Sequence, residues 1–417
     1  MQRPALRAPG QAVAGPRPSH RGTCVRPAMQ ISLFDYGFRP FFLGAGLAAL
    51  LLVPWWAAHL TLGVPLATDW PPALWHAHEM LFGFVCAAIA GFLLTAVPSW
   101  TGRKGFAGGP LVAMSALWLF GRLLVASSAS WPRMLVTSVD LAFLPLLGAF
   151  VARPLLRERN RNTPLLLVLL ALWLCNAVFH LGLLRGNVVL SRQVLVVGID
   201  LVAVMVTVVG GRIVPSFTAG VLRRHGMADA VRASRTLTTL AVGLMVAVAV
   251  VDLLRPESTF AGWAALAAAV AQAMRLARWQ GHRMHGEPLV WILQVAYAWL
   301  PVGLALKALA LFAGLPLAAH WLHALTVGSI ATMILGVMTR LPLGHTGRPL
   351  RPHPFTIAGY LLVVGAALAR VLGPRFLPAD YLTVISTSTA LWTAGFGLFL
   401  LVYAPILIAP RLHARRR

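Results

Sequence analysis

The feature that most constrains this chain is a series of long apolar runs. A helix needs about 20 mostly apolar residues to cross a bilayer, and the sequence has about twelve runs of that length. In the first half of the chain they cover residues 41–60, 75–97, 110–128, 132–152, 164–184 and 193–211. In the second half they cover 237–254, 260–277, 289–312, 320–339, 355–372 and 382–409. These runs predict an all-α integral membrane protein with about twelve transmembrane helices.

The composition excludes a soluble fold. Only 11% of the 417 residues are charged and 59% are hydrophobic, whereas about 25% of the residues of a soluble domain are charged. The lipid bilayer is therefore the expected partner, because lipid solvates apolar side chains directly. The formal net charge of +24 does not indicate nucleic-acid binding, because the cations lie in short loops between the apolar runs.

The distribution of Lys and Arg predicts the orientation. Alternate loops are rich and poor in these residues, and loops rich in them stay in the cytoplasm. The rich loops contain Arg103 and Lys104, then Arg153, Arg157, Arg159 and Arg161, then Arg223, Arg224, Arg232 and Arg235, then Arg275, Arg278 and Arg283, and last Arg348 and Arg351. We therefore predict a multi-pass protein of a bacterial inner membrane with both termini in the cytoplasm.

Two regions follow from this organisation. Residues 1–28 are rich in Arg, Pro and Gly and lack an apolar core, so we interpret them as a disordered basic tail rather than a signal peptide. Residues 29–417 form a polytopic helical membrane domain. Met29 precedes the first apolar run and is an alternative start of translation.

The second and tenth runs share a sequence pattern. When the two runs are aligned at one constant offset, His78 matches His323. Two glycines that follow His78 then match two glycines that follow His323, and the Thr-Gly-Arg segment that begins at Thr101 matches the one that begins at Thr346. The sixth run also ends in a similar segment, at Pro215. Runs two, six and ten are four apart, which suggests three related units of four helices.

Six histidines from four runs are predicted to lie near the outer ends of the helices. Polar side chains inside membranes are costly and usually face the bundle interior, and imidazole is a common ligand of metals and haem. The matched pair His78 and His323 are the first candidates for ligands that face each other, followed by His76 and His180. The remaining two are His59 and His320. The alternative for each single histidine is a structural position at the level of the lipid headgroups.

Several charged residues lie inside the apolar runs and need partners. Arg122 and Asp140 fall at similar depth, which favours an ion pair. Glu79 follows His78 and is placed to orient an imidazole or relay a proton. Asn176 lies one turn before His180 and is the candidate to hold its ring by a hydrogen bond. Asp200 and Lys307 are candidates for a proton path or for a pair with each other. At the inner ends, Arg212 and Arg340 either extend to the headgroups or bind an anion such as a haem propionate.

Three motifs resemble the NnrS family. They are Leu33-Phe34-Asp35-Tyr36-Gly37-Phe38-Arg39-Pro40-Phe41-Phe42, Trp75-His76-Ala77-His78-Glu79-Met80 and Gly211-Arg212-Ile213-Val214-Pro215-Ser216-Phe217-Thr218. The resemblance runs from about Leu33 to the last apolar run. It implies a twelve-helix membrane protein that contains haem and copper and is linked to denitrification and to nitric-oxide stress. The family has no settled reaction, so the resemblance does not decide whether the chain is an enzyme.

Haem-copper oxidases also have twelve helices and outer-face histidine ligands on helices two and ten. This sequence lacks the adjacent histidine pair and the His-to-Tyr spacing of the oxidase copper site, which argues against an oxygen- or nitric-oxide-reducing centre of that type.

Three hypotheses of function follow. The leading one is a haem- and copper-binding membrane protein that protects against nitric oxide, with nitric oxide or nitrosylated metal centres as partners. A secondary transporter of a small ion or a metal- or haem-related solute is the alternative from another class, because of the helix count and of intramembrane Glu79, Asp200 and Lys307. A third is an accessory factor that protects or assembles other metal centres.

Overall fold

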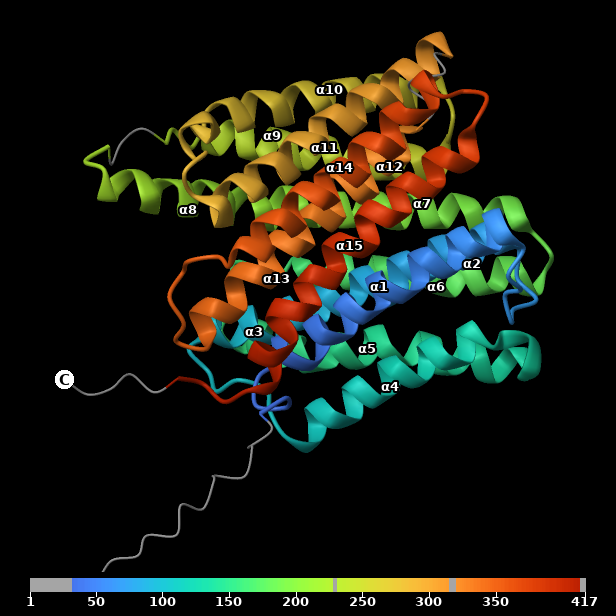
Figure 1. Cartoon of the computed structure of the whole chain (residues 1–417), viewed down its shortest axis with the longest axis horizontal. Coiled ribbons are helices and arrows are strands. Elements are labelled where there is room, and N and C mark those ends of the chain that lie inside the picture. The colour runs from blue at the N-terminus through green and yellow to red at the C-terminus, as the bar shows by residue number, and fades with distance from the viewer. Residues whose placement is uncertain (1–31, 228–230, 315–319, 413–417) are drawn as a thin grey trace, which may run out of the picture. The chain divides into compact units, whose positions relative to one another are not determined.

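The computed structural model describes residues 32–227, 231–314 and 320–412, and its secondary structure there is entirely helical (Figure 1). Twelve helical spans in this part are long and apolar enough to cross a membrane, so the predicted fold class is confirmed. The first six are α1 (Phe38–Leu62), Pro72–Thr101, α4 (Gly109–Ala126), α5 (Arg133–Arg157), α6 (Leu165–Leu184) and Val188–Arg224. The last six are α9 (Arg235–Leu254), α10 (Thr259–Ala277), α11 (Pro288–Ala313), Trp321–His345, α14 (Pro354–Phe376) and α15 (Tyr381–Ile408).

Spans two, six and ten differ from the others because each contains a π-helical segment. Span two is α2 (Pro72–His78), η1 (Glu79–Val85) and α3 (Cys86–Thr101). Span six is α7 (Val188–Met205), η3 (Val206–Gly210) and α8 (Gly211–Arg224). Span ten is α12 (Trp321–His323), η6 (Ala324–Ala331) and α13 (Thr332–His345). The three spans four apart that suggested related units therefore share a rare local structure, which often occurs at functional sites.

The same three spans form the centre of the bundle. In span two, 89% of the apolar window is buried, against 28% in α9. Each span packs mainly on its neighbours in sequence, and α15 packs on α1, so the first and last spans lie side by side (Figure 1). Segment α7 touches both η1 and η6. Span six is therefore in contact with spans two and ten, inside a shell of more exposed helices.

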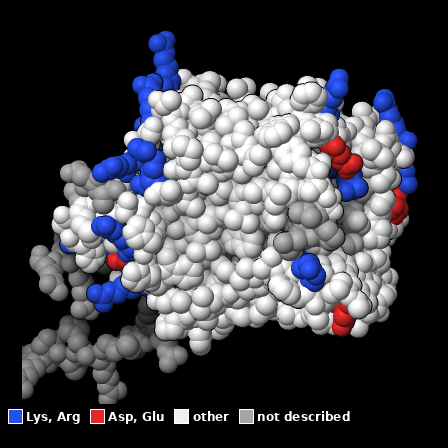
Figure 2. Space-filling view, turned by 90° about the horizontal axis from the view of Figure 1, so that it is seen from above, with Lys and Arg blue, Asp and Glu red and all other residues white. Residues whose placement is uncertain are grey.

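Both ends of the described chain lie at one end of the bundle. The Ser32 N–H donates to the Ile408 carbonyl at 2.9 Å, and the Leu412 N–H donates to the Thr346 carbonyl at 3.0 Å. Figure 2 shows Lys and Arg toward the two ends of the helices and an almost uncharged surface between them. An even number of crossings explains why the two ends coincide. The cytoplasmic location of these ends stays a prediction, and so does the 1–28 tail with Met29, which lies outside the described residues.

Two expected helix ends were wrong. Span two was predicted to end at Val97, but α3 continues through Pro98 to Thr101 and ends at Gly102, whose φ of 65° suits a glycine. Span six was expected to end at Gly211, but it continues as α8 to Arg224. A proline in a short terminal helix removes only one hydrogen bond. The helix also buries Val214, Thr218 and Val221 on one face, a spacing that favours its continuation.

Candidate functional site

A cluster of polar side chains is buried between spans two, three, four and five. We call it the His78 cluster, and it consists of His78, Glu79, Arg122, Asp140, Asn176 and His180. His78 ends α2, Glu79 begins η1, Arg122 lies on α4, Asp140 on α5, and the last two on α6. His78 and Glu79 are fully buried, and Asp140 and Asn176 are nearly so. The cluster therefore joins four helices through polar contacts inside an apolar bundle.

Hydrogen-bond acceptors surround the His78 ring. Its Nδ1 lies 3.2 Å from Glu79 Oε1, and its Nε2 lies 3.0 Å from Asn176 Oδ1 and 3.2 Å from Asp140 Oδ2. The Asn176 amide is oriented by its Nδ2, which donates to Asp140 Oδ2 at 2.7 Å. A neutral imidazole has only one N–H and leaves its other nitrogen without a donor to face. Both ring nitrogens are therefore satisfied when a second proton lies on the ring or on a facing carboxyl group, or when one nitrogen binds a metal ion.

The charges of the cluster lead to the same conclusion. Arg122 contacts Glu79 and Asp140, so one guanidinium faces two carboxylates. If both carboxylates are ionised, this leaves one net negative charge in a buried site, which is unfavourable without a compensating cation. A proton or metal ion at His78 supplies the missing positive charge.

The geometry at Asp140 suits a metal ion. The ligand atoms of His78, Asp140 and His180 all lie within 4.8 Å of one another, and Asp140 Oδ2 is 3.2 Å from His78 Nε2 and 3.0 Å from His180 Nε2. Two ligands of one ion are typically about 3–3.4 Å apart when each bond is about 2.0–2.1 Å long. Two imidazoles and one carboxylate are a ligand set that transition metals accept.

The Nδ1 atom of each of the two imidazoles also has a hydrogen-bond partner. His78 Nδ1 faces Glu79, and His180 Nδ1 lies 3.2 Å from Thr137 Oγ1. Ligating histidines almost always use their second nitrogen in this way, which sets the tautomer and the ring orientation. The ring of Trp70 stands edge-on to both imidazoles, at 5.1 Å and 5.5 Å between centroids, and packs over the site.

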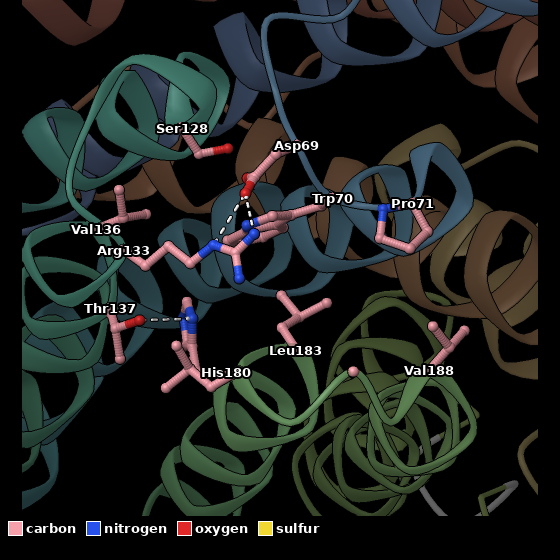
Figure 3. Close-up of a pocket in the computed structure, with 12 residues that line it drawn as sticks. Asp69, Trp70, Pro71, Ser128, Arg133, Val136, Thr137, His180, Leu183 and Val188 are labelled. Carbon is pink, nitrogen blue, oxygen red and sulfur yellow. Dashed lines mark hydrogen bonds and ion pairs between the residues drawn. The ribbon is translucent and has the colours of Figure 1, made fainter.

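A cavity connects this cluster with the outer end of the bundle, the end opposite to the described termini. Its volume is about 160 Å³, and His180, Thr137 and Trp70 line it. Figure 3 shows Arg133 directed at Asp69 on one side and His180 beside Thr137 on another. Arg133 donates twice to Asp69 Oδ2, at 3.0 and 2.8 Å, and this pair is partly exposed. A metal ion or a diatomic molecule fits this volume.

A second histidine group lies between spans two, ten and eleven. The titratable groups around His323 are His76, His320 and Arg370, and Arg370 also acts on His76 and on His320. The His76 ring stacks on Trp56 at 4.9 Å, and its Nδ1 is buried without a hydrogen-bond partner among the described residues. Arg370 donates to the Tyr381 hydroxyl at 2.6 Å through Nη2, while its Nη1 is buried and unpartnered. We call these four residues the His323 group.

The structure thus places His78 and His323 in two separate groups, whereas the sequence match predicted that they face each other. The polar groups around His78 and those around His323 have no member in common, and His323 has His76 as its neighbour on span two. His59 joins neither set: its Nδ1 lies 2.9 Å from the Val64 carbonyl. Which histidines bind a cofactor stays a prediction.

The expected partners of the charged residues were partly right. Arg122 contacts Asp140, as favoured, and Glu79 lies against the His78 ring. Asn176 bonds to His78 and Asp140, not to His180, because Asp140 of the neighbouring helix α5 meets both Asn176 and His180.

The two inner arginines lie away from the histidines. Arg340 is 17 residues after His323, which is about 25 Å along the helix, and it covers the Phe217 ring at 3.9 Å. Arg212 contacts Asn162. Neither is placed to bind a haem propionate beside His323.

Lys307 pairs with Asp252 rather than with Asp200, and both oxygens of Asp200 are buried without a hydrogen-bond partner. Asp252 and Arg370 were not among the residues predicted for a site. Each lies inside an apolar run, near its outer end, and a search for every charged residue within the runs finds both. Cys86 and Cys175 are free and buried, in positions that suit packing.

Arg275 was counted among the loop cations, and this was wrong. It is 4% exposed and donates to the backbone carbonyls of Thr207 and Gly211 at 2.7 and 3.2 Å. These carbonyls lie in and just after η3, where the π-helical segment changes the hydrogen-bond ladder. Arg275 therefore supports that segment instead of orienting a loop.

Comparison with known proteins identifies the family. The sequence model of the family described as NnrS protein matches residues 32–411. No curated protein matches the sequence. Because the match covers nearly the whole chain, including all twelve spans and both histidine groups, the protein belongs to the NnrS family.

Proposed function

We propose that this protein binds copper at the His78 cluster and haem at the His323 group, and that it acts in the nitric-oxide response at the inner membrane. Membership of the NnrS family supports the connection with nitric oxide. The observation that carries the proposal is the buried set of His78, Asp140 and His180, whose ligand atoms lie within 4.8 Å of one another.

The His78 cluster fits copper in charge and in donor type. Imidazole is a good ligand for copper, and a monovalent ion balances the single net negative charge of Glu79, Asp140 and Arg122. In this arrangement His78 and His180 bind through Nε2 and Asp140 through Oδ2, while Glu79 and Thr137 hold the second nitrogens of the two rings. Arg122 holds the carboxylates in place.

The His323 group fits haem. Haem iron takes imidazole ligands, and the group offers one histidine from each of the central spans two and ten, namely His76 and His323. Its two unpartnered atoms match the needs of such a cofactor. His76 Nδ1 is a free nitrogen donor, and Arg370 Nη1 is a free N–H for a propionate.

The bound metals supply a centre that binds nitric oxide. The chain provides an apolar setting, two sites near the outer side and the cavity beside His180, which admits a diatomic molecule. An accessory factor that protects or assembles other metal centres would use the same two sites without converting a substrate. The proposal therefore assigns binding and leaves the reaction class open.

Metal analysis of purified variants tests the copper site. We expect stoichiometric copper in the wild type and its loss in His180→Ala and Asp140→Asn, with the haem spectrum retained. Asp69→Asn is the matched control, because Asp69 lies at the cavity but holds no ligand position, so its copper content should equal that of the wild type. Stoichiometric copper in both site variants, or a wild type without haem and copper, would refute the proposal.

A secondary transporter remains the second candidate. It is favoured by Asp200, a fully buried acid whose oxygens have no partner, since such acids often mark ion pathways in membranes. A purified protein that is colourless and metal-free, but that moves a solute into vesicles, would support it over a haem protein.

A further inference from the structure

A second set of buried charges lies apart from both histidine groups. Asp200 is on α7, Asp252 on α9 and Lys307 on α11, and we call these residues the Asp200 cluster. Lys307 Nζ contacts Asp252 Oδ2 and lies 4.7 Å from the centroid of the Trp321 ring. Asp200 is fully buried, and the charges of Lys307 and Asp252 both act on it. The cluster therefore joins helices α7, α9 and α11, none of which carries a residue of the His78 cluster.

The cluster has one carboxylate more than it has cations. Lys307 forms an ion pair with Asp252, which leaves Asp200 without a counter-charge. The other titratable group near Asp200 is the thiol of Cys175 on α6, which carries no positive charge in any state. From span two, the apolar side chain of Leu81 packs against Gly198 beside it. The charge of Lys307 favours an ionised Asp200, but the charge of Asp252 opposes it, and Lys307 already pairs with Asp252.

An ionised Asp200 is unfavourable for a second reason. Neither of its oxygens accepts a hydrogen bond from a described residue, and the neighbouring carboxyl group of Asp252 adds a negative charge. A buried carboxylate in such a setting costs so much that it takes up a proton instead. With one proton on Asp200 and an ion pair between Asp252 and Lys307, the cluster becomes electrically neutral.

The depths of the three residues form a route from the outer end. The side-chain amide of Gln193 donates to the carbonyls of Asp252 and Leu253 at 3.2 and 2.8 Å, so Gln193 is level with the end of α9. Asp200 lies seven residues further along α7, about 10 Å deeper in the bundle. Asp252 and Lys307 thus lie between the outer surface and Asp200.

We propose that the Asp200 cluster is a proton-binding site that holds one exchangeable proton on Asp200, reached from the outer side through Asp252 and Lys307. The ligand is a proton rather than a metal ion, because the ammonium of Lys307 already pairs with Asp252 and a proton is enough to neutralise Asp200. This site does not depend on the proposed copper and haem sites.

Infrared spectroscopy of the purified full-length protein tests the proposal at neutral pH. A protonated carboxyl group gives a carbonyl stretch that shifts in heavy water, and a carboxylate does not. We expect this band in the wild type and a clear loss of intensity in Asp200→Asn. Lys307→Gln should increase the band, because two acids then share a site without a cation and both become protonated.

Asp380→Asn is the matched control. Asp380 is exposed at the start of α15, and the hydroxyl and backbone N–H of Thr383 donate to it and lower its pKa, so it is ionised and contributes no such band. Should Asp200→Asn fail to insert, Asp200→Glu replaces it, and the band should move rather than vanish. Absence of the band in the wild type, or an unchanged band in the Asp200 variants, would overturn the proposal. Neither readout depends on bound haem or copper.

Discussion

His78 and His323 occupy equivalent positions in two different spans, yet the titratable groups around them differ. Each is the last residue before a π-helical segment, η1 in span two and η6 in span ten. His78 lies against Asp140 and Asn176 of spans four and five, whereas the titratable neighbours of His323 are His76, His320 and Arg370. The sequence match between the spans therefore extends to a rare backbone feature but not to the surroundings of the two rings.

This difference yields a prediction about the haem ligands. His76→Ala or His323→Ala should remove or shift the haem absorption spectrum, because each removes one imidazole of the His323 group. His78→Ala should retain that spectrum and lose copper. Exposed His282 and His353 provide controls, and their Ala variants should keep both cofactors.

The pairing expected from the sequence match makes the opposite prediction. If His78 and His323 bind one haem, then His78→Ala removes the spectrum and His76→Ala does not. The two single variants therefore decide between the arrangements without a double mutant.

Arg122 should be essential to stability. It is 11% exposed and contacts two carboxylates that are almost fully buried. Its replacement by Leu leaves both acids without their shared cation, and the loss of one partner of a buried ion pair costs about 3–5 kcal/mol. Thermal unfolding in detergent should show this as a large decrease in Tm. Arg122→Lys keeps the charge but not the two-armed geometry of the guanidinium, so its Tm should lie between those of Arg122→Leu and the wild type. A wild-type Tm for Arg122→Leu would contradict the structure.

Arg275 offers a test of the π-helical segment in span six. In Arg275→Ala the carbonyls of Thr207 and Gly211 lose their donor, and each unsatisfied buried group costs about 1–3 kcal/mol. The midpoint of unfolding should fall accordingly. The neighbouring Arg278 is exposed, so Arg278→Ala should change stability little, and equal effects of the two substitutions would show that Arg275 acts only as a loop cation.

Reporter fusions test the orientation. Fusions in the loops at Gly63 and Gly314 should report a periplasmic location, and fusions at Asn160 and His282 a cytoplasmic one, because the loops of the second pair are rich in Lys and Arg. The reverse pattern would place both histidine groups on the cytoplasmic side and close the proposed route from the periplasm to Asp200.

The sequence alone determined the twelve spans and the set of chemically active residues. Hydropathy is a local property, so a window of about 20 residues suffices to find each span. An ionisable residue within a span is equally visible from the sequence, because its presence there is costly whatever it contacts. His78, Asp140 and Lys307 were found in this way, and the same search applied to every span also finds Asp252 and Arg370.

Only the tertiary structure decided which of these residues meet. The direction in which a side chain points depends on the rotation of its helix, and a π-helical segment rotates everything beyond it relative to a regular α-helix. No local pattern revealed η1, η3 or η6. The sequence therefore could not show that Asp140 meets both His78 and His180, or that His76 is among the titratable groups around His323. Nor could it show that Lys307 pairs with Asp252 instead of Asp200. Partner choice is set by the packing of helices from distant parts of the chain, and that packing exists only in the folded bundle.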